Sequence, residues 1–264
     1  LNLSNPYQDE MHLEPNYNSS SIYDPKDPYK NRDPRMLATM YYHLSHRKCY
    51  WQANEGSYQP GVRDRLITTN VEDTYTGRSS TTGRGRTLTG YYHRKTLHPL
   101  GGRDTPREMR EGPPVKLFRY AEILLNYAEA AAEYGQLTDA LSAINELRAR
   151  VGMPAIPNSI SKENLILRIR NERRIELAYE EHRYFDVRRW SNPNDDLSKT
   201  DKWITAMDIR IDASQPTGYS YTRTTVRTNP RECWKNKNLL LPIPHDEAAR
   251  LENITGKKWQ RPNW

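Results

Sequence analysis

Apolar residues recur at helical spacing between Val115 and Trp190, and this is the clearest structural pattern in the chain. Before Gly135 they fall three or four positions apart, as on one face of an amphipathic helix: Leu117, Ala121, Leu124, Leu125, Ala128 and Ala132. Gly135 is expected to end this helix, because glycine tolerates a left-handed backbone. A second helix, capped by Thr138 and ended by Gly152, would then complete an antiparallel helical hairpin.

A third helix is expected after Ser161, which can serve as its N-cap. Its apolar positions have the same period as those of the hairpin, so the three helices should share one core. The residues predicted to pack together in that core are Leu124, Ala128, Leu141, Ile144, Ile169 and Leu177.

Charged residues crowd the second half of this helical region. Acid follows acid at helical spacing from Glu172 to Glu176 to Glu180, and like charges so placed repel unless arginines lie between them. Two interpretations stay open: a solvated charged face, or a partly buried network of arginine–carboxylate pairs with a structural role. The residues predicted for such a network are Arg119, Glu122, Glu172, Glu176, Arg183 and Asp186.

The rest of the chain shows little periodicity. Residues 1–35, 45–110 and 218–227 are expected to be loops, residues 36–44 and 203–211 a strand or a short helix, and residues 245–251 one or two helical turns. The predicted fold class is therefore mainly α, with long irregular loops and little β. The predicted organisation is a loop-rich ligand-side region at 1–114, a helical core at 115–190, and C-terminal loops with a short helix at 191–264.

Composition narrows the possible functions. Hydrophobic residues make up only 35% of the chain, so no segment is apolar enough to cross a membrane. The net charge of +7 is compatible with nucleic acid or an acidic polysaccharide, but no block of lysine and arginine of the nucleic-acid-binding kind occurs, and no nucleic acid partner is expected. Cys49 and Cys233 lie far apart in the sequence and have no metal-ligand spacing, and we expect free thiols.

The sequence contains none of the common catalytic signatures. HExxH, GxSxG and kinase motifs are absent. His43 and His46 could share a helical face, but they are interpreted as ordinary surface histidines, so neither a metal nor a cofactor is expected. Glu172 and Glu176 are the obvious candidates for a glycosidase carboxylate pair, and we assign them instead to the arginine network.

Several blocks of the sequence resemble a known family. RYAEILLNYAEA, ALSAINELRAR, ERRIELAYEEHRYFDVRRW and LLLPIPHDEAARLEN, with DPYKNRDPR and GYYHRK upstream and QRPNW at the end, are similar to the C-terminal half of the SusD/RagB family. Members of this family are surface lipoproteins of Bacteroidota that capture glycans. The chain departs from the family pattern at Glu181, where the family often has glycine. A glutamate there must either adopt the turn or continue the helix.

The resemblance implies a SusD-like C-terminal region with a TPR-like helical hairpin, and an N-terminal half and lipidated N-terminus outside this chain. It implies a non-catalytic protein that binds oligosaccharide or polysaccharide on the extracellular face of the outer membrane. The implied partner is a SusC-like TonB-dependent transporter, and membrane association would come from the lipid anchor. No cofactor is implied.

The aromatic composition agrees with a sugar-binding surface, because Tyr 18 and Trp 6 far outnumber Phe 2. Tyrosine and tryptophan combine a flat apolar face with a polar edge. The richest stretch is RKCYWQANEGSY, and the residues predicted to bind glycan are Tyr50, Trp51, Gln52, Asn54 and Tyr58. The alternative for Trp51 is packing within its own domain. Two other functions stay open: a carbohydrate-active hydrolase domain, and a helical-repeat module that binds a peptide or protein.

Overall fold

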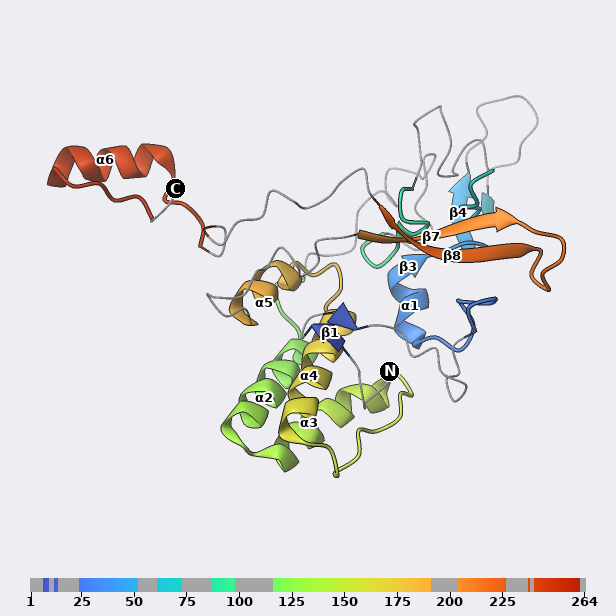
Figure 1. Ribbon diagram of the computed structural model, residues 1–264, viewed down its shortest axis with the longest axis horizontal. Coiled ribbons are helices and arrows are strands. Elements are labelled where there is room, and N and C mark those ends of the chain that lie inside the picture. Colours follow the sequence, from blue (N-terminus) through green and yellow to red (C-terminus); the bar gives the residue numbers. More distant parts are fainter. Residues whose placement is uncertain are drawn as a thin grey trace.

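Four helices between residues 120 and 190 form one side of the molecule, and three of the four short antiparallel strand pairs lie on the other (Figure 1). This computed structural model describes residues 7–9, 12–13, 24–51, 61–72, 87–97, 116–190, 204–226, 237 and 240–261. Within these residues the fold is mainly helical with long irregular segments, as predicted from the sequence.

The helical hairpin consists of α2 (Tyr120–Tyr134) and α3 (Leu137–Arg150). Gly135 ends α2 with φ of 95°, as predicted, and its N–H donates to the Ala132 carbonyl. Two details of the prediction are wrong. The N-cap of α3 is Gln136, so Thr138 lies inside the first turn, and Leu117 precedes α2 and is 85% exposed.

The predicted third helix is two helices, α4 (Lys162–Glu176) and α5 (His182–Trp190). Ser161 caps α4, since its hydroxyl accepts a hydrogen bond from the Asn164 N–H at 3.3 Å. Between the helices Tyr179 and Glu181 take left-handed conformations, with φ of 62° and 64°. The glutamate at the position where glycine is frequent therefore adopts the turn, at the cost of a strained backbone.

The apolar core is divided into two clusters rather than one. The larger cluster joins the hairpin to α4 and contains Ala128, Ala131, Ala132, Ala140, Leu141, Ala143, Ile144, Ile156, Leu165 and Ile169. The smaller contains Ala121, Leu125, Leu147 and Leu177. Leu177 was predicted to pack with the larger cluster, but it lies beyond the last turn of α4 and packs in the smaller one. Leu124 packs against both clusters and links them.

Two antiparallel strand pairs occupy segments that were predicted to be mostly loop. Strand β4 (His46–Trp51) pairs with β5 (Gly61–Leu66), and β7 (Ile204–Ile211) pairs with β8 (Tyr219–Val226). The loop prediction is wrong for β4, β5 and β8, whereas β7 lies within residues 203–211, which were predicted as a strand or a short helix. The reason is visible in β8, whose sequence YSYTRTTV has high strand propensity but no alternation of apolar and polar residues. Without that alternation, a strand cannot be identified from hydrophobic periodicity.

The remaining elements are short. They are α1 (Pro34–Thr39), β1 (Tyr7–Asp9), β2 (His12–Leu13), β3 (Met40–Tyr41), β6 (Tyr92–His93) and α6 (His245–Thr255). Residues 36–44, predicted as either helix or strand, thus contain the end of α1 and all of β3. Helix α6 has eleven residues, more than the one or two turns predicted. None of its residues is buried, and Figure 1 shows it apart from the helical core.

Backbone hydrogen bonds join the strand pairs through the segments between them. The Val71 N–H donates to the Ile209 carbonyl oxygen at 2.8 Å, and the Met207 N–H donates to the Thr89 carbonyl oxygen at 2.9 Å. Gly90 lies at this contact with φ of 83°, and a Cβ there would be 2.8 Å from the Met207 carbonyl oxygen. Only glycine fits this close approach without a shift of the backbone.

Candidate functional site

The predicted glycan-binding residues lie at the end of β4 and between β4 and β5 in the sequence. Tyr50 and Trp51 are the last two residues of β4, and their backbones lie opposite Val62 and Gly61 in the register. Gln52, Asn54 and Tyr58 lie outside the described residues. The five residues therefore remain a prediction, which now falls at the end of a strand and in the segment that joins it to β5.

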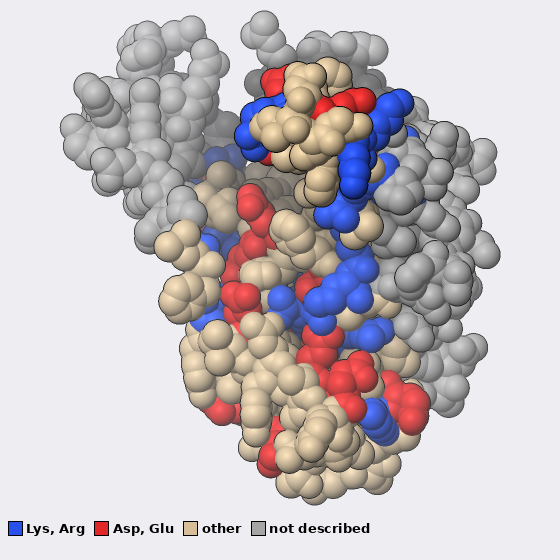
Figure 2. Space-filling view, turned by 90° about the vertical axis from the view of Figure 1, so that its left-hand side faces the viewer, with Lys and Arg blue, Asp and Glu red and all other residues tan. Residues whose placement is uncertain are grey.

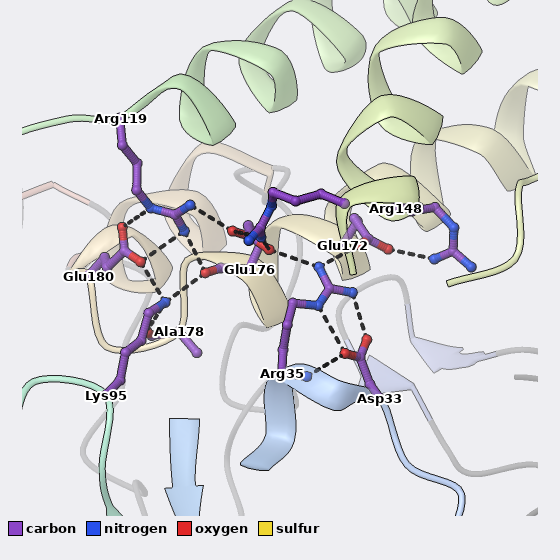
Figure 3. Close-up of polar contacts among 10 residues, drawn as sticks. Asp33, Arg35, Lys95, Arg119, Arg148, Glu172, Glu176, Ala178 and Glu180 are labelled. Carbon is purple, nitrogen blue, oxygen red and sulfur yellow. Dashed lines mark hydrogen bonds and ion pairs between the residues drawn. The ribbon is translucent and has the colours of Figure 1, made fainter. Parts of the chain in front are cut away.

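Two glutamates of α4 are the centre of the best-defined polar site. Glu172 and Glu176 are one helical turn apart and are only 1% and 4% exposed. Burying a carboxylate costs several kcal/mol unless cations and hydrogen bonds compensate. Arginines from three other parts of the chain surround the pair (Figure 3).

Glu172 lies between a residue of α1 and a residue of α3. Arg35 Nη1 is 2.6 Å from its Oε1, and Arg148 Nη1 donates to its Oε2 at 2.7 Å. Arg35 is itself fixed by Asp33, whose carboxylate accepts from Arg35 Nε at 3.0 Å and Nη2 at 2.6 Å. This two-point contact orients the guanidinium plane toward α4.

Glu176 accepts hydrogen bonds from three arginines. The donors are Arg119 Nη1 at 2.6 Å, Arg150 Nη2 at 2.7 Å and Arg35 Nη1 at 3.0 Å. Burial by itself would raise the pKa of Glu176, but hydrogen bonds from Arg119 and Arg35 outweigh burial and lower it. The carboxylate is therefore ionised at neutral pH, and Arg35 contacts both glutamates.

A second group of contacts fixes the turn after α4. Lys95 Nζ donates to the carbonyls of Glu176 at 2.7 Å and Ala178 at 3.0 Å, and Arg119 Nη2 donates to Glu176 O at 2.7 Å. Both cations also contact the Glu180 carboxylate. The last carbonyls of a helix have no partner within the helix, and here two cations satisfy them. This explains how two left-handed residues other than glycine are held in one turn.

A third group of contacts attaches α5 to α2 and α4. Arg173 Nε donates to Asp186 Oδ2, and Arg173 Nη1 donates to Asn126 Oδ1, each at 2.7 Å. Glu129 of α2 accepts from Arg189 Nη1 and from the Trp190 indole N–H, each at 2.6 Å. Burial would raise the pKa of Glu129, but these two hydrogen bonds lower it.

Four of the six residues predicted for the network belong to these groups. Arg119, Glu172, Glu176 and Asp186 make the contacts given above, Glu122 lies 3.6 Å from His182 Nε2, and Arg183 is half-buried on α5. Four further cations of the network were not predicted from the sequence: Arg35, Lys95, Arg148 and Arg150. Arg148 and Arg150 lie in the last turn of α3, where the helix dipole favours cations, so their position could have been predicted from the sequence. Arg35 and Lys95 are the last residues of the family-like blocks DPYKNRDPR and GYYHRK, but helical periodicity does not indicate which residues they contact.

The geometry of Glu172 and Glu176 does not fit glycoside hydrolysis. A glycosidase needs a general acid with a raised pKa, beside a cleft that admits a sugar. Both glutamates are buried against arginines, and the pKa of Glu176 is lowered. Among the described residues no group of three histidine, cysteine or acidic side chains could hold a metal ion.

A cluster of tyrosines surrounds His43, which is buried and not at the surface as predicted. Its ring is 1% exposed, its Nδ1 accepts from the Thr69 N–H at 3.0 Å, and the Tyr219 ring meets it edge-on at 4.3 Å. Tyr29 and Tyr42 stack nearby at 4.4 Å. Several of the many tyrosines are therefore structural, and they fill the space between residues 29–43 and β8.

Solved structures with this arrangement are SusD-like proteins, which have a helical, TPR-like fold. A SusD-like protein from Bacteroides fragilis NCTC 9343 matches 99% of this chain with a TM-score of 0.66 and 28% identity, over 46% of its own length. The protein named BT4246 matches 93% of this chain with a TM-score of 0.61 and 25% identity, over 39% of its length. SusD-like protein P38 of Formosa agariphila is 38% identical over 79 residues, 27% of this chain and 16% of that protein.

The family model of the SusD family matches residues 3–264, so the chain belongs to the SusD family. It spans less than half the length of the solved relatives that it matches. Within the described part of the chain, no helix has both the length and the hydropathy needed to cross a membrane.

Proposed function

We propose that this chain is part of a non-catalytic, cell-surface glycan-binding protein that delivers oligosaccharides to a SusC-like TonB-dependent transporter. Membership of the SusD family over residues 3–264 is the observation that carries the proposal. By resemblance, the protein is attached by a lipid to the extracellular face of the outer membrane. The family's glycan capture, transporter and anchor are transferred to this chain on that basis.

The polar network fits the role of a rigid scaffold beneath a binding surface better than that of a catalytic centre. Arg35 and Lys95 come from the region before the helical core, and both contact the end of α4 and the turn after it. The segment with the predicted sugar-binding residues lies between Arg35 and Lys95 in the sequence. A fixed support lets aromatic rings meet a sugar without first losing conformational freedom.

The predicted platform is Tyr50, Trp51 and Tyr58, with Gln52 and Asn54 as hydrogen-bond partners for sugar hydroxyls. Stacking on an aromatic ring contributes roughly 1–3 kcal/mol for a nucleobase, and a similar value is assumed for a sugar. Two or three rings then support dissociation constants on the order of millimolar to micromolar. Affinity in this range suits capture followed by release to a transporter.

Affinity electrophoresis of the protein in gels that contain neutral or acidic polysaccharides tests the proposal. Retardation by at least one polysaccharide is expected, with no release of reducing ends during incubation. Trp51→Ala should weaken binding by about 5- to 150-fold, the equivalent of one lost ring. Its Tm should be unchanged.

Trp259→Ala is the matched control, because Trp259 is an exposed tryptophan outside the predicted platform. It should bind like the unaltered protein. Absence of retardation by every polysaccharide would contradict glycan binding, and release of reducing ends would indicate a hydrolase. Retained binding with a lowered Tm for Trp51→Ala would make Trp51 a core residue.

A further inference from the structure

Most of the net charge of the chain comes from the segment that carries the predicted glycan-binding residues. Residues 45–110 contain twelve lysines and arginines against six aspartates and glutamates, and the net charge of the whole chain is +7. Residues 116–190, which form the helical core, contain twelve cations against eleven acids. Figure 2 shows blue and red side chains interspersed on the helical side of the molecule. The excess of positive charge therefore belongs to the segment before the helical core.

The β4–β5 ribbon contains four of these cations and one acidic residue. The strands read HRKCYW and GVRDRL, and the cations are Arg47, Lys48, Arg63 and Arg65. The acidic residue is Asp64, whose carboxylate lies 3.1 Å from His46 Nδ1. Because a strand pair fixes the spacing of its residues, the cations form a regular pattern that a ligand can match.

The register of the ribbon gathers three of the four cations on one face. Arg47 lies opposite Arg65, and Arg63 is two residues before Arg65. Opposed residues of an antiparallel pair share a face of the ribbon, and so do residues two apart along a strand. The positions of Arg47, Arg63 and Arg65 therefore fall on one face, which we call the arginine face. Trp51 belongs to the same face, whereas Tyr50 falls on the other.

A fourth arginine lies close to Arg47 and comes from another segment. Arg94 follows β6, and its guanidinium carbon is 5.2 Å from the centre of the Tyr41 ring. The guanidinium carbon of Arg47 is 5.7 Å from the centre of the same ring. Arg94 also donates to the Leu37 carbonyl oxygen at 2.6 Å. Neither the carbonyl nor the ring carries a charge, so these contacts leave the positive charge of Arg94 in place.

The pairing of like charges across the ribbon specifies what kind of ligand this face would take. Two cations at opposed positions are unfavourable by themselves, and an anion bound beside them removes the penalty. A guanidinium group offers a planar fork of donors that matches the oxygens of an anionic group. We propose that the arginine face binds the carboxylate or sulfate groups of an acidic polysaccharide. This inference rests on the proposed glycan-binding function and names its substrate class.

Two features of the chain favour a polysaccharide over other polyanions. Trp51, on the arginine face, is of the residue type that stacks on sugars, with a flat apolar face and a polar edge. The chain also belongs to the SusD family. A single-stranded nucleic acid carries anions and stackable bases as well, so it is included among the probes.

Affinity electrophoresis of the 264-residue chain in three gels tests the inference. The gels contain polygalacturonate as the carboxylate probe, dextran sulfate as the sulfate probe, and dextran as the neutral probe. Retardation is expected in at least one acidic gel, and the stronger of the two identifies the anionic group. Raising the salt from about 50 mM to about 500 mM should weaken this interaction at least about 10-fold, because salt screens exposed charges.

Two double variants separate the arginine face from net charge. Arg63→Gln with Arg65→Gln should weaken binding to the acidic probe at least about 10-fold, through loss of charge-assisted hydrogen bonds. Its Tm should be unchanged or higher, because the repulsion between Arg47 and Arg65 is relieved. Arg250→Gln with Lys257→Gln is the control, since it removes the same charge from exposed positions in and after α6. It should bind like the unaltered protein.

Four results would overturn the inference. Equal loss of affinity in the two double variants would make the attraction a matter of net charge, and a lowered Tm for Arg63→Gln with Arg65→Gln would make the two arginines part of the fold. Equal affinity for a single-stranded thymidine oligonucleotide would show that any polyanion binds. Retardation by neutral polysaccharides alone would refute the acidic ligand and leave the proposed glycan binding intact, whereas no retardation by any polysaccharide would contradict both.

Discussion

Replacement of Glu176 by alanine is the sharpest test of the polar network. The carboxylate accepts from Arg35, Arg119 and Arg150, and removing it leaves three guanidinium groups without that partner. Arg150 is 55% exposed and regains water, so its loss is small. The side chain of Arg35 is only 8% exposed and cannot be hydrated where it lies.

Removing one member of a buried ion pair costs about 3–5 kcal/mol. Arg35 keeps its contacts with Glu172 and Asp33, and Arg119 keeps Glu180, so the lower end of this range applies. We therefore expect Glu176→Ala to lower the free energy of unfolding by about 3 kcal/mol. In a chain of this size that corresponds to a fall in Tm of roughly 6–12 °C.

Urea unfolding, followed by circular dichroism at 222 nm and by tryptophan fluorescence, measures the effect. Glu247→Ala is the matched control, because Glu247 pairs with Arg250 at 2.6 Å on the exposed surface of α6. A pair of that kind contributes about 0–1 kcal/mol. If the losses in free energy of unfolding caused by Glu176→Ala and Glu247→Ala differ by less than about 1 kcal/mol, the network is solvated and burial does not strengthen it.

Three further outcomes are expected. Because the pKa of Glu176 is lowered in the folded protein, its ionised carboxylate stabilises the fold at pH values above the ordinary glutamate pKa of 4.5. This contribution is lost as the pH falls below 4.5 and through the lowered pKa. Urea titrations should therefore show a smaller difference in the free energy of unfolding between Glu176→Gln and the unaltered protein in acid than at pH 7. Glu181→Gly should stabilise by roughly 0.5–1 kcal/mol through relief of a left-handed backbone, whereas Glu133→Gly in α2 should destabilise by a similar amount. Gly90→Ala should cost on the order of 2–3 kcal/mol in urea unfolding and Gly218→Ala, which has open space around it, about 1 kcal/mol.

Local patterns predicted the helical core well because its signals are local. A period of 3.6 residues identified α2, α3 and α4, and Gly135 and Ser161 marked ends that the structure confirms. Strand β8 was missed because its sequence, rich in threonine and tyrosine, shows no regular apolar face, whereas its partner β7 lies in a segment predicted as a strand or a short helix. The sequence did not decide whether Glu181 adopts a turn or continues the helix. The turn that forms there is held by Lys95 and Arg119, which are distant in the sequence.

The polar site was only half predictable for the same reason. Glu172 and Glu176 were identified because acidic residues one helical turn apart repel each other unless cations lie close by. Their main partners are distant in the sequence: 141 residues separate Arg35 from Glu176, and 81 separate Lys95 from the same residue. Helical periodicity carries no information on such separations. The buried position of His43 depends in the same way on β8, an element that the pattern did not identify.

The network also decides how the two sides of the molecule are joined. Arg35 lies in α1 and Lys95 follows β6, and both contact the segment from Glu172 to Glu180 with carboxylate or carbonyl partners. Apolar packing within the described residues is concentrated among α2, α3 and α4, so charge-assisted hydrogen bonds hold the strand-bearing region on the helical core. Such bonds are directional, whereas apolar contacts allow sliding. If Tyr50, Trp51 and Tyr58 form the proposed sugar-binding platform, directional contacts between the strand-bearing region and the helical core would hold their rings in a fixed position against a sugar.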